Sequence, residues 1–302
     1  MGALSFEPSL RSGEKWADGE IDLTLLERGV EPILSGTPSD VLNEFLEGGA
    51  SPNGIRPKII AKEHKGKLYV GSDTLEADEW LIKFRDPDDP KEIGKLEYIY
   101  WLMAKEAGLK VSESKLFKSG KHYYFGTKRF DRRKGSRLHL HTLSGLLGVS
   151  PLNFAVGYEH FAKAAIALTS DRRSQDEVLR IAAFNVLTCN QDDHSRNVSF
   201  MMDKDGKWEV APAYDLNFHR NRSDEHKMGI NGKGKLSIED LKAFGIELGI
   251  GKGAVSNTLE EVKDAVISFK KNAKTVELSK SEITRINSAL ESIMSEIDTI
   301  KF

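Results

Sequence analysis

Residues 189–197 read Cys-Asn-Gln-Asp-Asp-His-Ser-Arg-Asn, and this stretch decides how the rest of the chain is interpreted. Asp192 and Asn197 lie five positions apart within it. A β-hairpin is predicted over residues 198–210, because an Asp-Gly pair there separates two apolar runs. Asp215 follows just beyond the second predicted strand. The sequence therefore predicts a polar loop, a hairpin that turns the chain back, and a second carboxylate after it.

These polar side chains, in this order, suit phosphoryl transfer. That reaction needs a carboxylate that accepts the proton of the attacking hydroxyl, and an amide with a second carboxylate that hold Mg²⁺. Asp192 would supply the first, and Asn197 and Asp215 the other two. The same Asp-to-Asn spacing occurs in the catalytic loop of protein kinases, where a later Asp also binds the metal. The alternative is structural, since Asp and Asn in loops usually form turns and caps.

Upstream features favour the chemical interpretation. The Gly-rich residues 48–54 would let backbone N–H groups approach a phosphate closely, although they could equally form an ordinary surface loop. Lys83 lies in an apolar strand and would point away from its apolar neighbours, either toward ATP phosphates or simply toward solvent. A helix predicted over residues 91–107 carries Glu97, which either pairs with Lys83 or stabilises the helix start.

Composition limits the class of protein. The chain has 302 residues, of which 30% are charged and 39% hydrophobic, as in soluble globular proteins of one large or two smaller domains. A formal net charge of −2 gives no electrostatic case for direct binding of nucleic acid. No apolar run is long enough for a membrane helix, and no signal peptide is evident. The single cysteine, Cys189, excludes an internal disulfide and indicates the cytoplasm.

The apolar patterns predict a β-rich part followed by a helical part. Strands are predicted at residues 58–61, 68–70, 80–84, 111–117 and 123–130, and helices at residues 39–46 and 91–107. From Ser136 onward the sequence predicts mainly helices, at residues 158–168, 174–187, 236–241, 259–269 and 281–300. The charged turn at residues 128–133 would end the sheet and form the junction between two lobes.

With these pieces assembled, the chain resembles the HipA family of bacterial serine/threonine kinases, the toxins of HipA–HipB toxin–antitoxin pairs. The resemblance runs from the amino terminus to about Leu241. Its most specific parts are residues 48–58, Lys128-Arg129-Phe130-Asp131-Arg132, Asp192-Asp193-His194-Ser195-Arg196-Asn197 and Ala211-Pro212-Ala213-Tyr214-Asp215-Leu216. Together these stretches are far more specific than any one of them alone.

The resemblance implies a role for each matching residue. Asp192 would be the catalytic base, Asn197 and Asp215 would be the Mg²⁺ ligands, and Lys83 would bind the ATP phosphates. Lys128 and Phe130 would line the adenine site. The complete set of expected ATP-binding residues is Lys83, Ser51, Gly54, Lys128, Phe130, Asp131 and His194. A single histidine between carboxylates could instead anchor the loop by hydrogen bonds.

The resemblance also implies regulation and partners. Family members autophosphorylate a serine of the Gly-rich loop, and Ser51 is the matching candidate. A phosphoserine would bring a charge of about −1.5 to −2, which is unfavourable beside a triphosphate. Ser51-Pro52 could equally be a plain turn. The expected partners are a HipB-like DNA-binding antitoxin and a protein substrate such as an aminoacyl-tRNA synthetase. Longer members have an amino-terminal subdomain before the segment with which this chain begins. The chain therefore resembles short, HipT-like kinases, in which a small HipS-like protein supplies that subdomain.

The sequence and the resemblance together predict an α+β, two-lobed, protein-kinase-like fold. The β-rich nucleotide-binding lobe would span residues 1–127 and the helical catalytic lobe residues 128–302. The predicted activity is ATP- and Mg²⁺-dependent phosphorylation of protein serine or threonine. One alternative is a kinase-fold module that binds ATP and an antitoxin without transfer. A second is a metal-dependent phosphohydrolase built on Asp192, Asp193 and His194.

Overall fold

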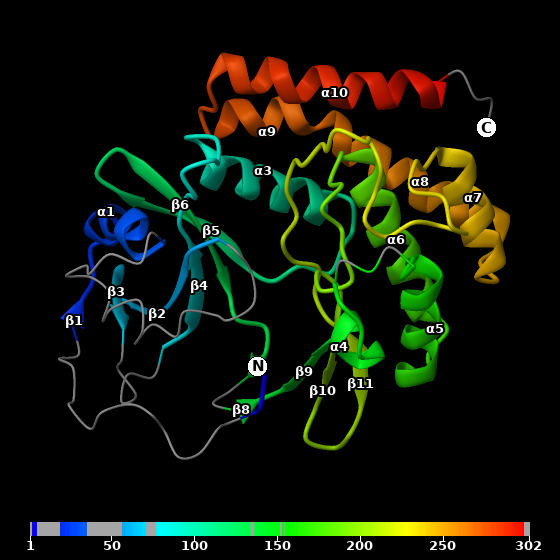
Figure 1. Ribbon diagram of the computed structural model, residues 1–302, viewed down its shortest axis with the longest axis horizontal. Coiled ribbons are helices and arrows are strands. Elements are labelled where there is room, and N and C mark those ends of the chain that lie inside the picture. The colour runs from blue at the N-terminus through cyan, green and yellow to red at the C-terminus, as the bar shows by residue number, and fades with distance from the viewer. Residues whose placement is uncertain are drawn as a thin grey trace. The chain divides into compact units, whose positions relative to one another are not determined.

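The computed structural model describes residues 2–4, 19–34, 56–70, 77–133, 136–151, 153 and 155–298 (Figure 1). The chain forms two compact units. The first, called the sheet unit here, comprises Ser5–Tyr98 and Ser112–Arg132. The second, called the helical unit, comprises Met1–Leu4, Ile99–Val111 and Arg133–Phe302.

The sheet unit is built on an antiparallel six-stranded sheet with the order β1-β3-β2-β4-β6-β5. Its strands are β1 (Gly19–Glu20), β2 (Lys58–His64), β3 (Lys67–Val70), β4 (Glu79–Lys83), β5 (Ser114–Ser119) and β6 (His122–Lys128). The turn at Lys65-Gly66 joins β2 to β3, as the sequence predicts. All five strands expected from the apolar patterns are therefore present in this sheet.

Alternation along the central strands decides which side chains reach the core. Ile59 and Ala61 on β2 are buried, and Trp80 and Ile82 on β4 are buried with them. Because side chains alternate along a strand, Lys83 lies on the face opposite to Ile82. This is the orientation that the sequence predicts for Lys83.

Helix α1 (Leu23–Leu34) was not among the predicted helices. Its side chains Leu23 and Leu26 are buried and belong to the same core as the sheet. The helix expected at residues 39–46 lies outside the described residues.

Helix α3 (Ile93–Glu106) confirms the helix predicted over residues 91–107. Its apolar side is buried, with Leu96, Ile99, Tyr100 and Met103 at most 1% exposed. The helix ends before Gly108, whose φ of 73° suits glycine, because a residue without a Cβ adopts left-handed backbone at little cost.

The helical unit contains a three-stranded sheet with the order β11-β10-β9. Strands β10 (Ser199–Met202) and β11 (Trp208–Val210) form the predicted hairpin, and the turn bond runs from the Gly206 N–H to the Asp203 carbonyl at 3.1 Å. The third strand, β9 (His139–Thr142), was not among the predicted elements and lies in the part that the sequence predicts to be mainly helical. All four of its residues are half-buried, so β9 shows no alternation in burial, and pairing with β10 determines its conformation.

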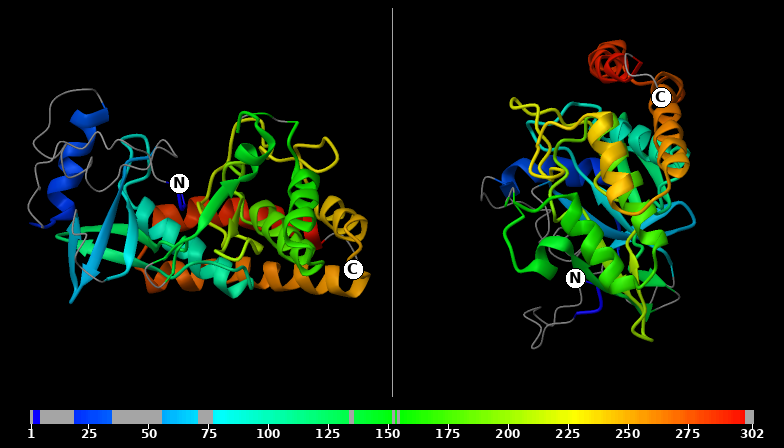
Figure 2. Two further views of the ribbon diagram at one scale, coloured as in Figure 1. Left: turned by 90° about the horizontal axis from the view of Figure 1, so that it is seen from below. Right: turned by 90° about the vertical axis from the view of Figure 1, so that its right-hand side faces the viewer.

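Short strands and helices complete the helical unit. Strands β7 (Arg132–Arg133) and β8 (Ser136–Arg137) form a separate two-stranded sheet. The helices are α4 (Leu143–Leu147), α5 (Tyr158–Thr169), α6 (Arg173–Leu187), α7 (Ile238–Glu247), α8 (Lys252–Ile267), α9 (Phe269–Thr275) and α10 (Lys280–Asp298). Figure 2 shows the last three following one another toward the carboxyl terminus. No helix within the described residues is long and apolar enough to cross a membrane.

Helix α6 is the central element of this unit. Most of its side chains are buried, including Val178, Leu179, Ala182 and Phe184 at 0% exposure. Burial on nearly every side fixes the position of the helix, and therefore the position of the loop that leaves its carboxyl end. That loop contains residues 189–197, with Asp192 and Asn197.

Candidate active site

The loop after α6 is anchored to the helix by Asn190. The Asn190 N–H donates to the Asn185 carbonyl at 2.9 Å, and its side-chain Nδ2 donates to the Asn185 Oδ1 at 2.9 Å. Between the helix and this anchor, Cys189 has a φ of 55°, an uncommon value for a residue with a Cβ. The chain therefore turns sharply out of α6 before it reaches Asp192.

The next residues close the loop on the Asp192 backbone. The Asp192 carbonyl accepts hydrogen bonds from the Asn197 Nδ2 at 3.0 Å and from the His194 N–H at 2.9 Å. In contrast, the carboxylate of Asp192 has no hydrogen-bonded partner in the part of the chain that the structure describes. The side chain is only partly buried. The loop thus holds the backbone of Asp192 and leaves its carboxylate available to a ligand.

The hairpin then brings the segment that carries Asp215 back to this loop. The Tyr214 hydroxyl donates to the Arg196 carbonyl at 2.5 Å and accepts from the Ser199 Oγ at 2.6 Å. Asn197 and both chain neighbours of Asp215, namely Tyr214 and Leu216, line one cavity. Asp215 itself is exposed and has a φ of 57°. The structure therefore places the Asp215 segment beside Asn197, as the sequence predicts for the hairpin.

The oxygen donors of Asp192, Asn197 and Asp215 have the chemistry that Mg²⁺ prefers. Mg²⁺ binds carboxylate and amide oxygens and usually keeps several water ligands, so one or two side chains suffice. The Nδ2 of Asn197 is occupied by the Asp192 carbonyl, which leaves its Oδ1 oriented as an acceptor. Across the described residues, no group of three or more His, Cys, Asp or Glu side chains could hold a metal ion.

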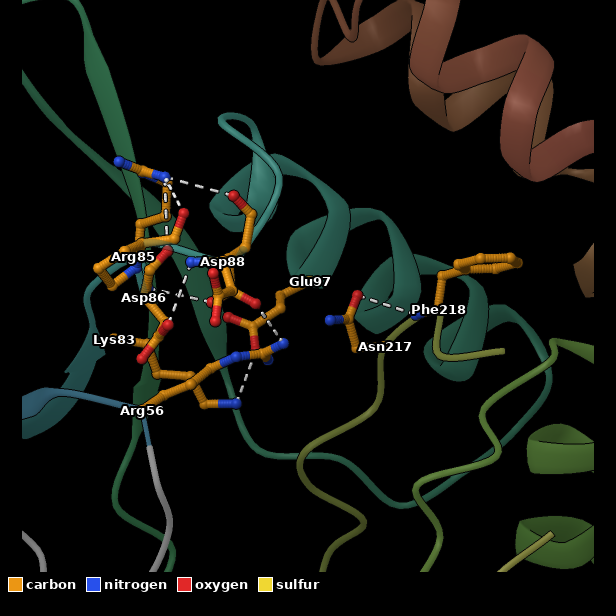
Figure 3. Close-up of polar contacts among 10 residues, drawn as sticks. Arg56, Lys83, Arg85, Asp86, Asp88, Glu97, Asn217 and Phe218 are labelled. Carbon is orange, nitrogen blue, oxygen red and sulfur yellow. Dashed lines mark hydrogen bonds and ion pairs between the residues drawn. The ribbon is translucent and has the colours of Figure 1, made fainter. Parts of the chain in front are cut away.

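In the sheet unit, Lys83 pairs with Glu97, which is one of the two alternatives that the sequence leaves open. The Lys83 Nζ lies 2.7 Å from the Glu97 Oε1, and the two side chains are only 11% and 3% exposed (Figure 3). Close pairing in a largely buried setting fixes the direction of the ammonium group. This pairing joins β4 to α3 and settles the choice between a structural and a paired Glu97.

Arg56 is a second cation on Glu97 that the sequence did not reveal. Its guanidinium lies 3.4 Å from the Glu97 carboxylate and 2.8 Å from that of Asp89. The turn at residues 85–89 fixes Asp89, since the Asp86 N–H donates to the Asp89 carboxylate at 3.1 Å. The available signal was the position of Arg56 directly after the Gly-rich stretch and before β2. One cavity is lined by Arg56, Lys83, Arg85, Lys91 and Glu97 among others, and its excess of cationic groups suits an anion.

The other expected ATP-binding residues are found in different settings. The Lys128 Nζ lies 2.6 Å from the Asp78 carboxylate. Asp131 is buried and accepts two hydrogen bonds from Arg129 at 2.9 and 2.7 Å. Burial raises the pKa of the Asp131 carboxyl, but the contacts with arginine outweigh this and lower the pKa below its usual value. The Nδ1 of His194 is buried and has no hydrogen-bond partner among the described residues. Phe130 directly precedes Asp131, while Ser51 and Gly54 lie outside the described part of the chain.

Comparison with known proteins identifies the family. The model of the HipA-like C-terminal domain matches residues 50–269, which is more than two thirds of the chain. The chain belongs to the HipA family. The matched region includes the Gly-rich stretch, Lys83, the loop with Asp192, and Asp215.

Curated relatives of this HipA-family chain are named as kinases. It is 28% identical over 186 residues to a candidate kinase of Haemophilus influenzae, a match that covers 56% of this chain and 52% of the relative. It is 25% identical over 185 residues to the serine/threonine-protein kinase toxin HipA of Shewanella oneidensis, covering 54% of this chain and 42% of the relative. The chain spans about half the length of the curated relatives that it matches.

Solved structures show the fold. HipA in the complex of HipA, HipB and operator DNA from Shewanella oneidensis gives a TM-score of 0.67 at 20% identity, with 95% of this chain and 73% of that chain covered. The proinflammatory kinase CtkA of Helicobacter pylori gives a TM-score of 0.52 at 12% identity, with coverages of 83% and 94%. The HipA-family chain therefore has the α+β, kinase-like fold that its sequence predicts.

Proposed function

We propose that this HipA-family chain is a protein serine/threonine kinase that transfers the γ-phosphoryl group of ATP in the presence of Mg²⁺. The observation that carries the proposal is the loop that closes on the Asp192 carbonyl through Asn197 while the Asp192 carboxylate remains available. A catalytic base needs this combination, because it must be held in place and still reach the proton that it accepts. The names of the curated relatives support the same activity.

Each residue has a role in this proposal. Asp192 accepts the proton of the substrate hydroxyl as that oxygen attacks the γ-phosphorus, while the bond from the γ-phosphorus to the β–γ bridging oxygen breaks and ADP leaves. Asn197 and Asp215 would hold Mg²⁺, which supplies charge neutralisation at the phosphates. Lys83, directed by Glu97 at 2.7 Å, contacts the phosphates. These residues therefore position the reactants and stabilise charge, which is where most catalysis of phosphoryl transfer arises.

The rest of the nucleotide site and its regulation belong to the same proposal. Lys128, Phe130, Asp131 and His194 contribute to the binding of ATP. Ser51 is the site of autophosphorylation, which would oppose ATP by like charge. Incubation of the purified protein with Mg²⁺-ATP followed by mass spectrometry of the peptide that contains Ser51 tests this step. An active preparation without phosphate at Ser51 would remove autophosphorylation from the proposal.

We propose further that the chain is the toxin of a toxin–antitoxin pair. A relative is named as a kinase toxin, and the solved HipA structure contains HipB and operator DNA. These names support a HipB-like DNA-binding antitoxin as partner, so that any contact with DNA would pass through that antitoxin. An aminoacyl-tRNA synthetase is the proposed substrate, and phosphoproteome comparison of cells with the active chain and with Asp192→Ala tests it.

The decisive experiment is transfer of ³²P from [γ-³²P]ATP to casein in the presence of Mg²⁺. Substitution Asp192→Ala should lower the rate about 10²- to 10⁴-fold, the contribution of a general base. Asp205→Ala is the matched control, because this exposed aspartate lies in the hairpin turn, and it should keep the parent rate. Transfer by Asp192→Ala at the parent rate would refute the role of Asp192. ATP binding by the parent without any transfer would favour the binding module instead.

A further inference from the structure

Asp193, the neighbour of the proposed base, is one of the most fully bonded carboxylates in the described part of the chain. It is 1% exposed. Its Oδ2 accepts from the Tyr158 hydroxyl at 2.6 Å and lies 2.9 Å from the His226 Nδ1, and its Oδ1 accepts the Lys227 N–H at 2.8 Å. An ionised carboxylate can only accept hydrogen bonds, so the His226 Nδ1 carries a proton. Three donors from two separate segments thus converge on Asp193.

The donors of Asp193 are themselves held in place. The Asn185 Nδ2 donates to the Tyr158 hydroxyl at 2.9 Å, and the Asn190 Nδ2 donates to the Asn185 Oδ1 at 2.9 Å. Tyr158, Asn185 and Asn190 are all buried. Because Tyr158 donates its hydroxyl hydrogen to Asp193, each hydrogen bond from Asn190 through Asn185 and Tyr158 to Asp193 has a defined direction. The network therefore links α5 and α6 to the loop with a single favourable arrangement.

Gln191, on the other side of Asp192, is tied to the same segment as Asp193. Its N–H donates to the His219 carbonyl at 2.9 Å, its Oε1 accepts the Asn221 N–H at 2.8 Å, and its Nε2 donates to the Asp224 Oδ1 at 2.9 Å. Asp192 therefore lies between two residues that residues 219–227 hold, while its own carboxylate stays unbonded among the described residues.

We infer that Asp193 is a positioning residue for phosphoryl transfer, acting with His226 and Tyr158 to fix the place from which Asp192 reaches the substrate hydroxyl. The inference rests on the proposed function. It assigns Asp193 no contact with substrate, ATP or metal. Displacement of a catalytic group by about 1 Å can lower a rate about 10²-fold. Loss of a hydrogen bond to Asp193 should therefore lower kcat and leave ATP binding unchanged.

The test uses the full-length chain, Mg²⁺-[γ-³²P]ATP and casein. His226→Ala removes one donor and should lower kcat about 10- to 100-fold while KM for ATP changes less than about twofold. His226→Asn should recover most of the rate, because its amide nitrogen can lie near the place of Nδ1. Tyr158→Phe deletes a single oxygen and should again lower kcat about tenfold. His64→Ala, on a half-buried histidine of β2 in the sheet unit, is the matched control and should match the parent.

The outcomes separate the inference from the proposed function. A folded His226→Ala or Tyr158→Phe with the parent kcat overturns the inference alone. The inference is also overturned if His226→Ala changes kcat, KM for ATP and the unfolding midpoint together and His226→Asn does not restore them. That result would mean that His226 only stabilises the fold. If His226→Ala does not fold, the comparison of Tyr158→Phe with the parent decides. Absence of transfer by the parent, or a normal rate in Asp192→Ala, would refute the proposed function itself.

Discussion

At the scale of single residues, Glu97 is the carboxylate on which two cations of the sheet unit depend. It is 2% exposed and lies 2.7 Å from the Lys83 Nζ and 3.4 Å from the Arg56 guanidinium. Removing one partner of a buried ion pair is costly, because the remaining charge loses its compensation in a poorly solvated place. Glu97→Ala should therefore lower the free energy of unfolding by about 3 kcal/mol, measured by urea denaturation.

Glu113→Ala is the control for Glu97→Ala. Its carboxylate lies 3.8 Å from the Lys128 Nζ and its side chain is 66% exposed, so the free energy of unfolding should change by less than about 0.5 kcal/mol. Equal effects of the two substitutions would contradict the structural importance given to Glu97.

Cys189 provides a second test at this scale, because it is the only thiol of the chain. It is 1% exposed, and burial raises the pKa of its thiol to about 12. Only the thiolate is strongly nucleophilic, so the native protein should react negligibly with Ellman's reagent at pH 8. In denaturant the thiol regains its ordinary pKa, and one equivalent should react. Rapid labelling of the native protein would mean that the turn out of α6 opens frequently.

At the scale of elements, the close approach of α3 to β6 depends on Gly94. A Cβ at this position would lie 2.4 Å from the Tyr123 carbonyl oxygen, and backbone atoms cannot move aside as a flexible side chain can. Gly94→Ala should therefore displace the start of α3 and lower the free energy of unfolding by about 2 kcal/mol, the usual cost of overpacking. Because α3 carries Glu97, ATP binding should weaken as well.

Gly253→Ala is the matched helical control for Gly94→Ala. Position 253 lies near the start of α8, and a Cβ there would meet no atom within 4 Å. Alanine favours helix over glycine by about 1 kcal/mol, so this variant should be as stable as the parent or slightly more stable in urea. A loss of stability at position 253 similar to that of Gly94→Ala would show that the contact with β6 is not the cause.

The sequence predicted elements well where local patterns determine them. The central strands of the sheet unit alternate in burial, and the Asp-Gly turn determines the β10–β11 hairpin. Both could therefore be predicted from residues that are neighbours in the sequence. The strands at residues 136–142 were not predicted within the generally helical part, because strand β9 depends on partners far along the chain, with His139 paired to Met202. Helix α1 was missed although Leu23 and Leu26 mark its buried side.

At the scale of the whole molecule, some features of the candidate site could be predicted from local sequence, and others depend on residues far apart in the chain. The spacing of Asp192 and Asn197, together with the hairpin, Asp215 and the upstream Gly-rich stretch and Lys83, marked the loop as a candidate site. The sequence offered pairing of Glu97 with Lys83 as one of two alternatives, and the structure shows that pairing. The hydrogen-bond partners of Asp193 could not be predicted from the sequence, because Tyr158 precedes it by 35 residues and His226 follows it by 33. Contacts at such separations depend on how α5, α6 and residues 219–227 pack, which no local pattern encodes.

The last prediction concerns the binding of Mg²⁺-ATP. A ligand that binds only the folded protein stabilises it by RT ln(1 + [L]/Kd), about 2.7 kcal/mol at a hundredfold excess over Kd. Mg²⁺-ATP should stabilise the parent by about this amount in urea denaturation. Lys83→Ala and Asp215→Ala should each abolish most of the stabilisation, because the proposed function assigns the ATP phosphates to Lys83 and Mg²⁺ to Asp215. EDTA should reduce it in the parent, and Lys121→Ala, at an exposed turn, should leave it unchanged. If either Lys83→Ala or Asp215→Ala keeps the full stabilisation, that residue does not bind the nucleotide complex and its assigned role is wrong.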